Sequence, residues 1–138
     1  MIVEPELRAW LGTIADELIP AADDMPAATE VGVADGQLDL VLGVRPDLAR
    51  ALARAWVLAG NQSAGPAMST LATLDPPAHQ AILEIVAGGY YSSDRVKRLL
   101  AYTGQQPTPL PPEDQPVYLA EELLERVVHR GPIYRVAR

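Results

Sequence analysis

The stretch that decides the fold is Leu74-Asp-Pro-Pro-Ala-His-Gln-Ala-Ile-Leu-Glu-Ile-Val-Ala-Gly-Gly-Tyr-Tyr-Ser-Ser-Asp-Arg-Val-Lys-Arg-Leu-Leu-Ala-Tyr-Thr-Gly-Gln-Gln-Pro107, whose pattern predicts a helical hairpin. Asp75 can cap the first helix, because its carboxylate can accept hydrogen bonds from the free backbone N–H groups two or three residues on. Pro76 follows at the first helical position, where a missing N–H costs nothing. The spacing of its apolar residues gives this helix one buried face: Ile82, Leu83, Val86 and Tyr90.

A second helix follows directly in the pattern. The pair Gly88-Gly89 weakens the first helix just before its end, and Ser92 or Ser93 can cap the next one, with Asp94 in its first turn. Its predicted buried stripe, which runs until Gly104, is Val96, Leu99, Leu100 and Thr103. The two helices would meet at a corner formed by the two adjacent tyrosines, Tyr90 and Tyr91.

The remaining chain also has helical periodicity, and it shows no long alternation of the kind that predicts strands. We expect helices over residues 5–19, around Leu38–Leu42, from Pro46 to Gly60, and around Met68–Leu74. Five prolines between 107 and 116 predict an extended strap, followed by a final helix from near Pro116 to Gly131-Pro132. The expected fold is all-α: a single compact bundle of about six or seven short helices, with a proline-rich strap before the C-terminal helix, in one domain over residues 1–138.

Composition narrows the function classes. The 138 residues carry a net charge of −7 and no cysteine, so no disulfide or thiolate site is available. Residues 1–47 hold ten acidic side chains against Arg8 and Arg45, while the rest of the chain is close to neutral. Nucleic acid and anionic membranes are therefore poor partners. The acidic third is either a solvated face or an interface with a basic partner surface. No signal peptide and no apolar stretch of membrane-spanning length is visible, so we expect a cytoplasmic protein; export together with a partner stays open.

The usual catalytic patterns are missing from the sequence. Ser63 lacks the Gly-x-Ser-x-Gly spacing of a nucleophile elbow, and no Gly-x-Gly-x-x-Gly dinucleotide turn exists. His79 and His129 lie 50 residues apart without the helical spacing of a metal site. The acidic pairs are adjacent in sequence, which on a helix points them in different directions. We therefore expect no catalytic, cofactor-binding or metal-binding residue in this chain, and no catalysis by the chain alone.

The aromatic residues divide into three groups. Trp10 and Trp56 lie on apolar helix faces and are expected in the core. The tyrosines Tyr90, Tyr91 and Tyr102 either close backbone groups at helix ends or form a patch that contacts a partner. The tail residues Ile133, Tyr134 and Arg135 follow a helix stop and complete the set of candidate interface residues.

The segment Gly89-Tyr90-Tyr91-Ser92, continued by Val96, Leu100, Tyr102 and Gly104, resembles a segment of the gluconate 2-dehydrogenase subunit 3 family. Leu18-Ile19-Pro20 and Val31-Gly32-Val33 resemble a second signature of that family. The resemblance implies a small helical subunit that accompanies a large flavoprotein of the glucose-methanol-choline (GMC) type, which carries the FAD. Many family members begin with a twin-arginine export signal; its absence here indicates either a member that works inside the cell or a trimmed N-terminus.

The resemblance therefore predicts a non-catalytic, accessory or chaperone-like subunit that binds and stabilises a flavin-dependent dehydrogenase of sugars, polyols or other alcohols. The cofactor would be FAD in the partner, with none in this chain. The alternative is a stand-alone helical module, with homo-oligomerisation left open, that binds a small apolar ligand between its helices.

Overall fold

The computed structural model describes residues 3–105 and 125–131, and it is all-helical over those ranges, as the sequence predicts. The chain divides into two units, Met1–Thr103 and Gly104–Arg138, and the single domain over residues 1–138 stays a prediction. The division falls where the helical packing of the first unit ends, and each unit is described by itself. Among the described residues, no helix combines the length and the apolar character that crossing a bilayer would require.

The first unit begins with α1 (Pro5–Leu18), close to the predicted 5–19. Its buried face includes Leu7, Trp10, Leu11 and Ile14. A short 3-10 turn, η1 (Thr29–Val31), is tied to α1 because the Asp16 carboxylate accepts from the Thr29 backbone N–H at 2.8 Å and from its hydroxyl at 2.7 Å. The next helix, α2 (Gly36–Val44), buries the three apolar residues that predicted it, Leu38, Val41 and Leu42.

Two further helices, α3 (Asp47–Ala59) and α4 (Ala64–Leu74), complete the base of the first unit. Trp10 on α1 and Trp56 on α3 meet edge to face, with ring centroids 5.5 Å apart and an interplanar angle of 66°. Trp10 is buried, and Trp56 is partly buried against the core. Both tryptophans therefore join helices in the interior, as expected.

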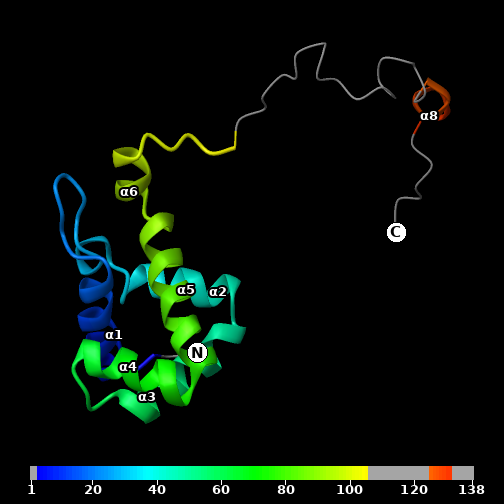
Figure 1. The fold of residues 1–138 in the computed structure, drawn as a ribbon. Coiled ribbons are helices and arrows are strands. Elements are labelled where there is room, and N and C mark those ends of the chain that lie inside the picture. The colour runs from blue at the N-terminus through cyan, green and yellow to red at the C-terminus, as the bar shows by residue number, and fades with distance from the viewer. Residues whose placement is uncertain (1–2, 106–124, 132–138) are drawn as a thin grey trace. The chain divides into compact units, whose positions relative to one another are not determined.

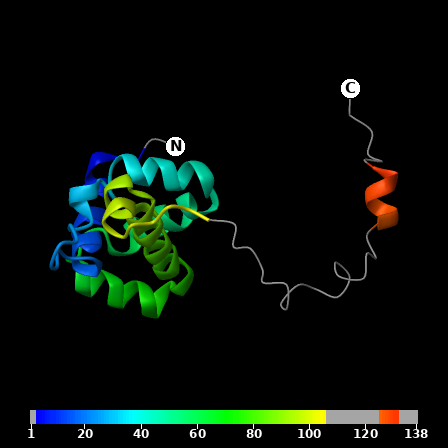
Figure 2. The same cartoon turned by 90° about the horizontal axis from the view of Figure 1, so that it is seen from above.

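The helix at the centre of the first unit is α5 (Pro76–Ser92), which packs against α2, α3, α4 and α6 (Figures 1 and 2). Its start is as predicted: the Asp75 carboxylate accepts from the Ala78 backbone N–H at 3.0 Å. The same carboxylate pairs with Arg54 of α3, with an N–O distance of 2.8 Å. The predicted N-cap residue Asp75 thus also joins α3 to the start of α5 through its ion pair with Arg54.

The Gly88-Gly89 pair lies just before the end of α5, as predicted, and the helix continues through it to Ser92. A Cβ atom placed on Gly89 would lie 3.4 Å from the Gln37 Cβ and 3.5 Å from a Val33 methyl carbon, which are ordinary contact distances. The pair thus packs against α2 and the turn before it, and this burial offsets its low helix propensity.

The last helix of the first unit, α6 (Asp94–Leu99), is shorter than predicted and buries only Val96 of the expected stripe. It ends because Ala101 has a left-handed backbone with φ of 51°. The Ala101 N–H donates to the Arg98 carbonyl at 3.1 Å, and the Tyr102 N–H donates to the Lys97 carbonyl at 2.9 Å. This hydrogen-bond pattern is a Schellman motif, which usually has glycine where this chain has Ala101.

In the second unit, the described residues form α8 (Glu125–Arg130), with an acidic residue in its first turn and His129 and Arg130 in its last. Gly131 has a φ of 66°, the left-handed conformation expected of a helix stop. The predicted strap over 107–116 and the predicted start of this helix near Pro116 lie outside the described residues.

Candidate interaction surface

The two adjacent tyrosines have opposite environments. Tyr90 is only 2% exposed, and its hydroxyl donates to the Pro26 carbonyl at 2.8 Å, joining the end of α5 to the loop after α1. Burial raises the pKa of the Tyr90 hydroxyl above its usual value. Tyr91 is 58% exposed, and its ring meets that of Tyr90 edge to face at 5.4 Å. Tyr90 thus satisfies a backbone carbonyl in the interior, whereas Tyr91 faces outward.

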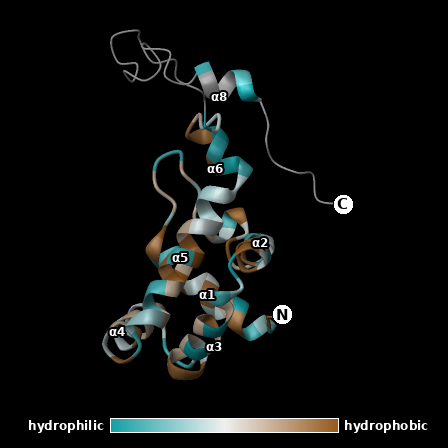
Figure 3. Ribbon diagram, turned by 90° about the vertical axis from the view of Figure 1, so that its right-hand side faces the viewer, coloured by the Kyte–Doolittle hydropathy of each residue, from teal (hydrophilic) through white to brown (hydrophobic). Residues whose placement is uncertain are grey.

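The outward-facing residues at the end of α5 and on α6 form what we call the corner surface. It comprises Tyr91, Lys97, Arg98, Leu99, Leu100 and Tyr102. Figure 3 shows α6 as largely hydrophilic with a hydrophobic end. The two leucines, predicted as part of a buried stripe, are 46% and 51% exposed, because no described element packs over this side of α6. The prediction that Leu99 and Leu100 are buried is therefore wrong, and both lie on the surface.

A groove of about 570 Å³ lies within the corner surface, lined by Tyr91, Lys97, Leu100 and Tyr102. The turn that ends α6 makes this arrangement, since the left-handed Ala101 lets the Tyr102 N–H return to the Lys97 carbonyl. Tyr91 comes from α5 and Lys97 from α6, so the groove spans the junction of the two helices. Of the candidate interface residues, Tyr91 and Tyr102 therefore share one hollow, and Tyr90 does not line it.

Positive charge gathers on α6 in an otherwise acidic protein. Arg95 lies 3.5 Å from a Glu30 oxygen and Lys97 lies 3.7 Å from an Asp94 oxygen, both at exposed positions. Such pairs contribute little, with a median of about 0–1 kcal/mol. In the part of the chain that the structure describes, Arg98 makes no ion pair. The corner surface thus offers cations that a partner can engage.

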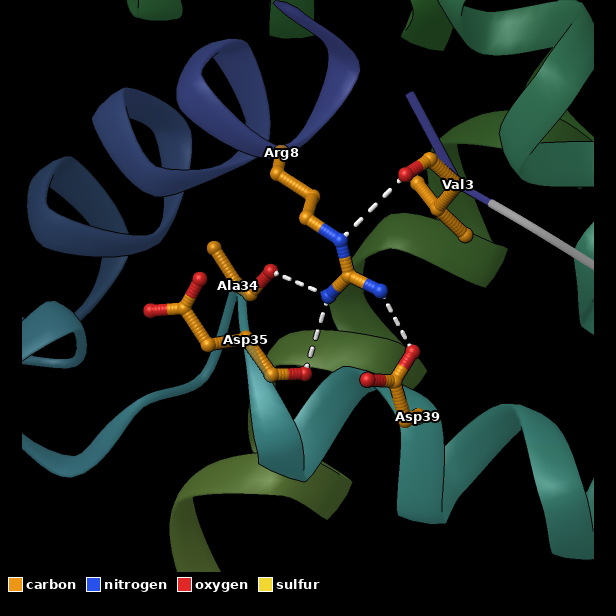
Figure 4. A network of polar contacts seen from close by, with 5 residues as sticks. All are labelled: Val3, Arg8, Ala34, Asp35 and Asp39. Carbon is orange, nitrogen blue, oxygen red and sulfur yellow. Dashed lines mark hydrogen bonds and ion pairs between the residues drawn. The ribbon is translucent and has the colours of Figure 1, made fainter. Parts of the chain in front are cut away.

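The most connected polar network elsewhere in the first unit is structural. Arg8 donates to the carbonyls of Ala34 at 2.9 Å and Asp35 at 3.0 Å, to the Val3 carbonyl at 3.4 Å, and to the Asp39 carboxylate (Figure 4). Every guanidinium nitrogen therefore has a partner within the fold. The network fixes α1 to the start of α2.

No metal site or acid-base centre emerges from the described residues. They contain no group of three or more His, Asp or Glu side chains that could hold a metal ion. His79 lies in the first turns of α5, half-buried. Ser63 directly precedes α4, and the region before it is helical. In the second unit, His129 lies 3.8 Å from Glu125 on α8.

Other exposed apolar side chains lie away from the corner surface. Val57 on α3 is 86% exposed and Leu74 at the end of α4 is 66% exposed. A second groove, of about 440 Å³, lies between α2 and α5, with Leu40, Val44 and Ala87 among its lining residues. The described lining of the α2–α5 groove has no aromatic residue, which distinguishes it from the corner surface, whereas Val57 lines a hollow beside Trp56.

Sequence reasoning identified Tyr91 and Tyr102 as surface candidates but missed Lys97, Arg98, Leu99 and Leu100. The sequence did contain a signal that this helix is exposed. Three of its few residues, at positions 95, 97 and 98, are cationic, so most of the helix surface cannot be buried. The tail candidates Ile133, Tyr134 and Arg135 lie outside the described residues.

Comparisons of the chain with protein-family models, with curated proteins and with solved structures gave no match. The resemblance to the gluconate 2-dehydrogenase subunit 3 family, with the partner and the cofactor that it implies, therefore stays a prediction.

Proposed function

We propose that this chain is an interaction subunit that binds a larger protein through the corner surface and stabilises it. The observation that carries the proposal is the exposure of Tyr91, Leu100 and Tyr102 around one groove, with exposed Leu99 adjacent in sequence to Leu100. Tyrosines and aliphatic side chains bury much area at low entropy cost, and they are typical anchors when they surround a hollow. A stable complex would bury about 1,200–2,000 Å² in total, so neighbouring residues would form the rim.

The proposed partner is a flavin-dependent oxidoreductase of the GMC type, acting on sugars, polyols or other alcohols. Its identity comes from the resemblance of the segment around Tyr90, Tyr91 and Tyr102 to the small-subunit family. In the proposed complex, the partner holds FAD and this chain supplies contact area.

The alternative, a small apolar ligand bound between helices, has a weaker basis. The apolar groove between α2 and α5 is bordered by Val44, which is 75% exposed, and by Leu40, which is 52% exposed. Small-molecule sites bury about 70–90% of their ligand. An open groove of this kind would leave a small ligand largely in water.

The test begins with affinity capture from an extract of the native cell, using the tagged chain as bait. Bound protein is identified by mass spectrometry, and the eluate is examined for flavin absorbance. The captured flavoprotein is then produced recombinantly and co-purified with wild-type and variant chains. Leu100→Asp places a charge in the groove and should abolish co-purification.

The matched control is Leu74→Asp. Leu74 is an exposed leucine like Leu100, but it lies at the opposite end of α5, whose 17 residues span about 25 Å. This variant should co-purify as the wild type does. Capture without any flavoprotein, or equal loss of binding in the two variants, would contradict the proposal.

A further inference from the structure

We propose that the corner surface recognises an acidic, apolar segment of its partner, in which an aromatic or aliphatic side chain enters the groove and an adjacent carboxylate meets Lys97. This inference rests on the proposed function, because it specifies the chemistry of the contact at the surface named there. It commits to a polypeptide as the occupant of the groove.

The shape of the corner surface favours a protein segment over a lipid surface. Tyr91, Leu100 and Tyr102 line a hollow of about 570 Å³, which has the size to receive a protruding side chain. A bilayer presents no such protrusion, and insertion into it would need an apolar projection rather than a recess. Two tyrosines at a groove are the kind of anchor found at the centre of protein interfaces.

The charge of the groove favours an acidic segment. Lys97 is the charged residue among the described residues that line it, and Arg95 and Arg98 are close in sequence on the same helix. The Lys97 side chain is 39% exposed, and its pair with Asp94 is long, at 3.7 Å, so a partner carboxylate can replace Asp94. Asp94 itself is 85% exposed, so it loses little when it returns to water.

The acidic third of the chain differs from α6 in charge. The protein as a whole carries −7, and residues 1–47 are its acidic part, so an acidic partner is repelled from that part and attracted to α6. Complementary potentials of this kind set the orientation and speed of docking. The basic corner therefore fixes which side of the protein an acidic partner can approach.

The experiment is a selection of random peptides displayed on phage against the whole chain, followed by affinity measurement with synthetic copies of the enriched peptides. We expect enrichment of peptides in which Asp or Glu neighbours an aromatic or aliphatic residue. Lys97→Glu should weaken their binding by about tenfold or more, and raised salt should weaken binding to the wild type.

The matched control is Arg50→Glu, which makes the same change of charge at an exposed position on α3, where Arg50 has no ion pair among the described residues. Its affinity for the peptides should stay within about twofold of wild type, because it lies outside the groove. Circular dichroism of both variants checks that they are folded.

Three results would overturn the inference: enriched peptides without an acidic preference, equal effects of the two substitutions, or no enrichment at all. Binding of phosphatidylcholine vesicles containing phosphatidylserine, lost on Leu100→Asp, would replace it with a membrane contact. Capture of a flavoprotein without acidic-peptide binding would remove this inference alone. Acidic-peptide binding without a captured flavoprotein would instead remove the proposed identity of the partner.

Discussion

Replacing Tyr90 with phenylalanine tests whether Tyr90 stabilises the fold while the adjacent Tyr91 does not. The substitution deletes one hydroxyl that is buried and donates to the Pro26 carbonyl at 2.8 Å, across 64 positions of sequence. Pro26 is also buried, so its carbonyl would be left without this partner. Leaving a buried acceptor unsatisfied costs about 1–3 kcal/mol, and we expect Tyr90→Phe to lower the free energy of unfolding by that amount.

The assay is urea unfolding followed by circular dichroism, with a thermal scan beside it. For a unit of this size, each kcal/mol lowers the melting temperature by about 4–8 °C. The urea dependence of the free energy should be unchanged, because the substitution does not alter how much surface unfolding exposes. The control is Tyr91→Phe, which removes an exposed hydroxyl and should stay within about 0.5 kcal/mol of the wild type.

The same variant predicts a pH dependence. Because burial raises the pKa of the Tyr90 hydroxyl, the folded state favours the neutral phenol more than the unfolded state does. The stabilisation is therefore complete below the unfolded pKa of about 10, and it declines as the pH rises beyond that value. The stability difference between wild type and Tyr90→Phe should narrow above that pH. A Tyr90→Phe variant as stable as Tyr91→Phe at neutral pH would refute the structural role given to Tyr90.

Three further substitutions have outcomes fixed by local geometry. Ala101→Gly should raise the melting temperature, because a left-handed backbone costs alanine about 1–2 kcal/mol and costs glycine nothing. An unchanged or lower melting temperature would contradict the left-handed conformation of Ala101. Gly60→Ala should cost about 1–3 kcal/mol in urea unfolding, since its Cβ would lie 2.3 Å from the Trp56 ring and 2.5 Å from the Trp56 carbonyl oxygen, and a neutral result would contradict this close approach. Asp75→Ala should be less stable than Asp75→Asn, because asparagine can still cap α5 while both lose the pair with Arg54. Arg54 holds the pKa of Asp75 below its usual value, so the wild-type advantage over Asp75→Asn should be present above the unfolded pKa of about 3.9 and disappear as the pH falls through the lower folded value.

The helices could be predicted from sequence because their signals are local. Pro5, Asp75 and Pro76 mark helix starts, and the apolar spacing of Leu7, Trp10 and Ile14 gives a buried face, all of which the structure confirms. The fold class follows from such patterns, since each helix with one apolar face must bury it against another element.

Two features could not be predicted because they depend on residues distant in sequence. Gly88-Gly89 lowers the helix propensity of α5, and no local pattern indicates that α2 and Val33 pack against the pair. Leu99 and Leu100 fall on the same periodic stripe as Val96, but periodicity does not show whether another element covers that stripe. For the same reason the corner surface could not be predicted, because a leucine at helical spacing is normally interpreted as a core residue.

The candidate site was predicted only in part. Tyr91 and Tyr102 were correctly placed near one corner, whereas the separation of Tyr90 from them depends on a carbonyl 64 residues away that no local pattern indicates. The basic residues of α6 were visible in the sequence, but their meeting with the tyrosines around a groove required the turn at Ala101.

The most direct test of the central claim is size-exclusion chromatography of the recombinant chain mixed with the flavoprotein captured from the native extract, with flavin absorbance followed across the elution. We predict one early-eluting complex that contains both proteins and the flavin, while the chain alone carries no flavin and Leu100→Asp elutes separately from the flavoprotein. Separate elution of the wild-type chain, or flavin bound to the isolated chain, would contradict the claim that this protein supplies a contact surface and its partner the cofactor.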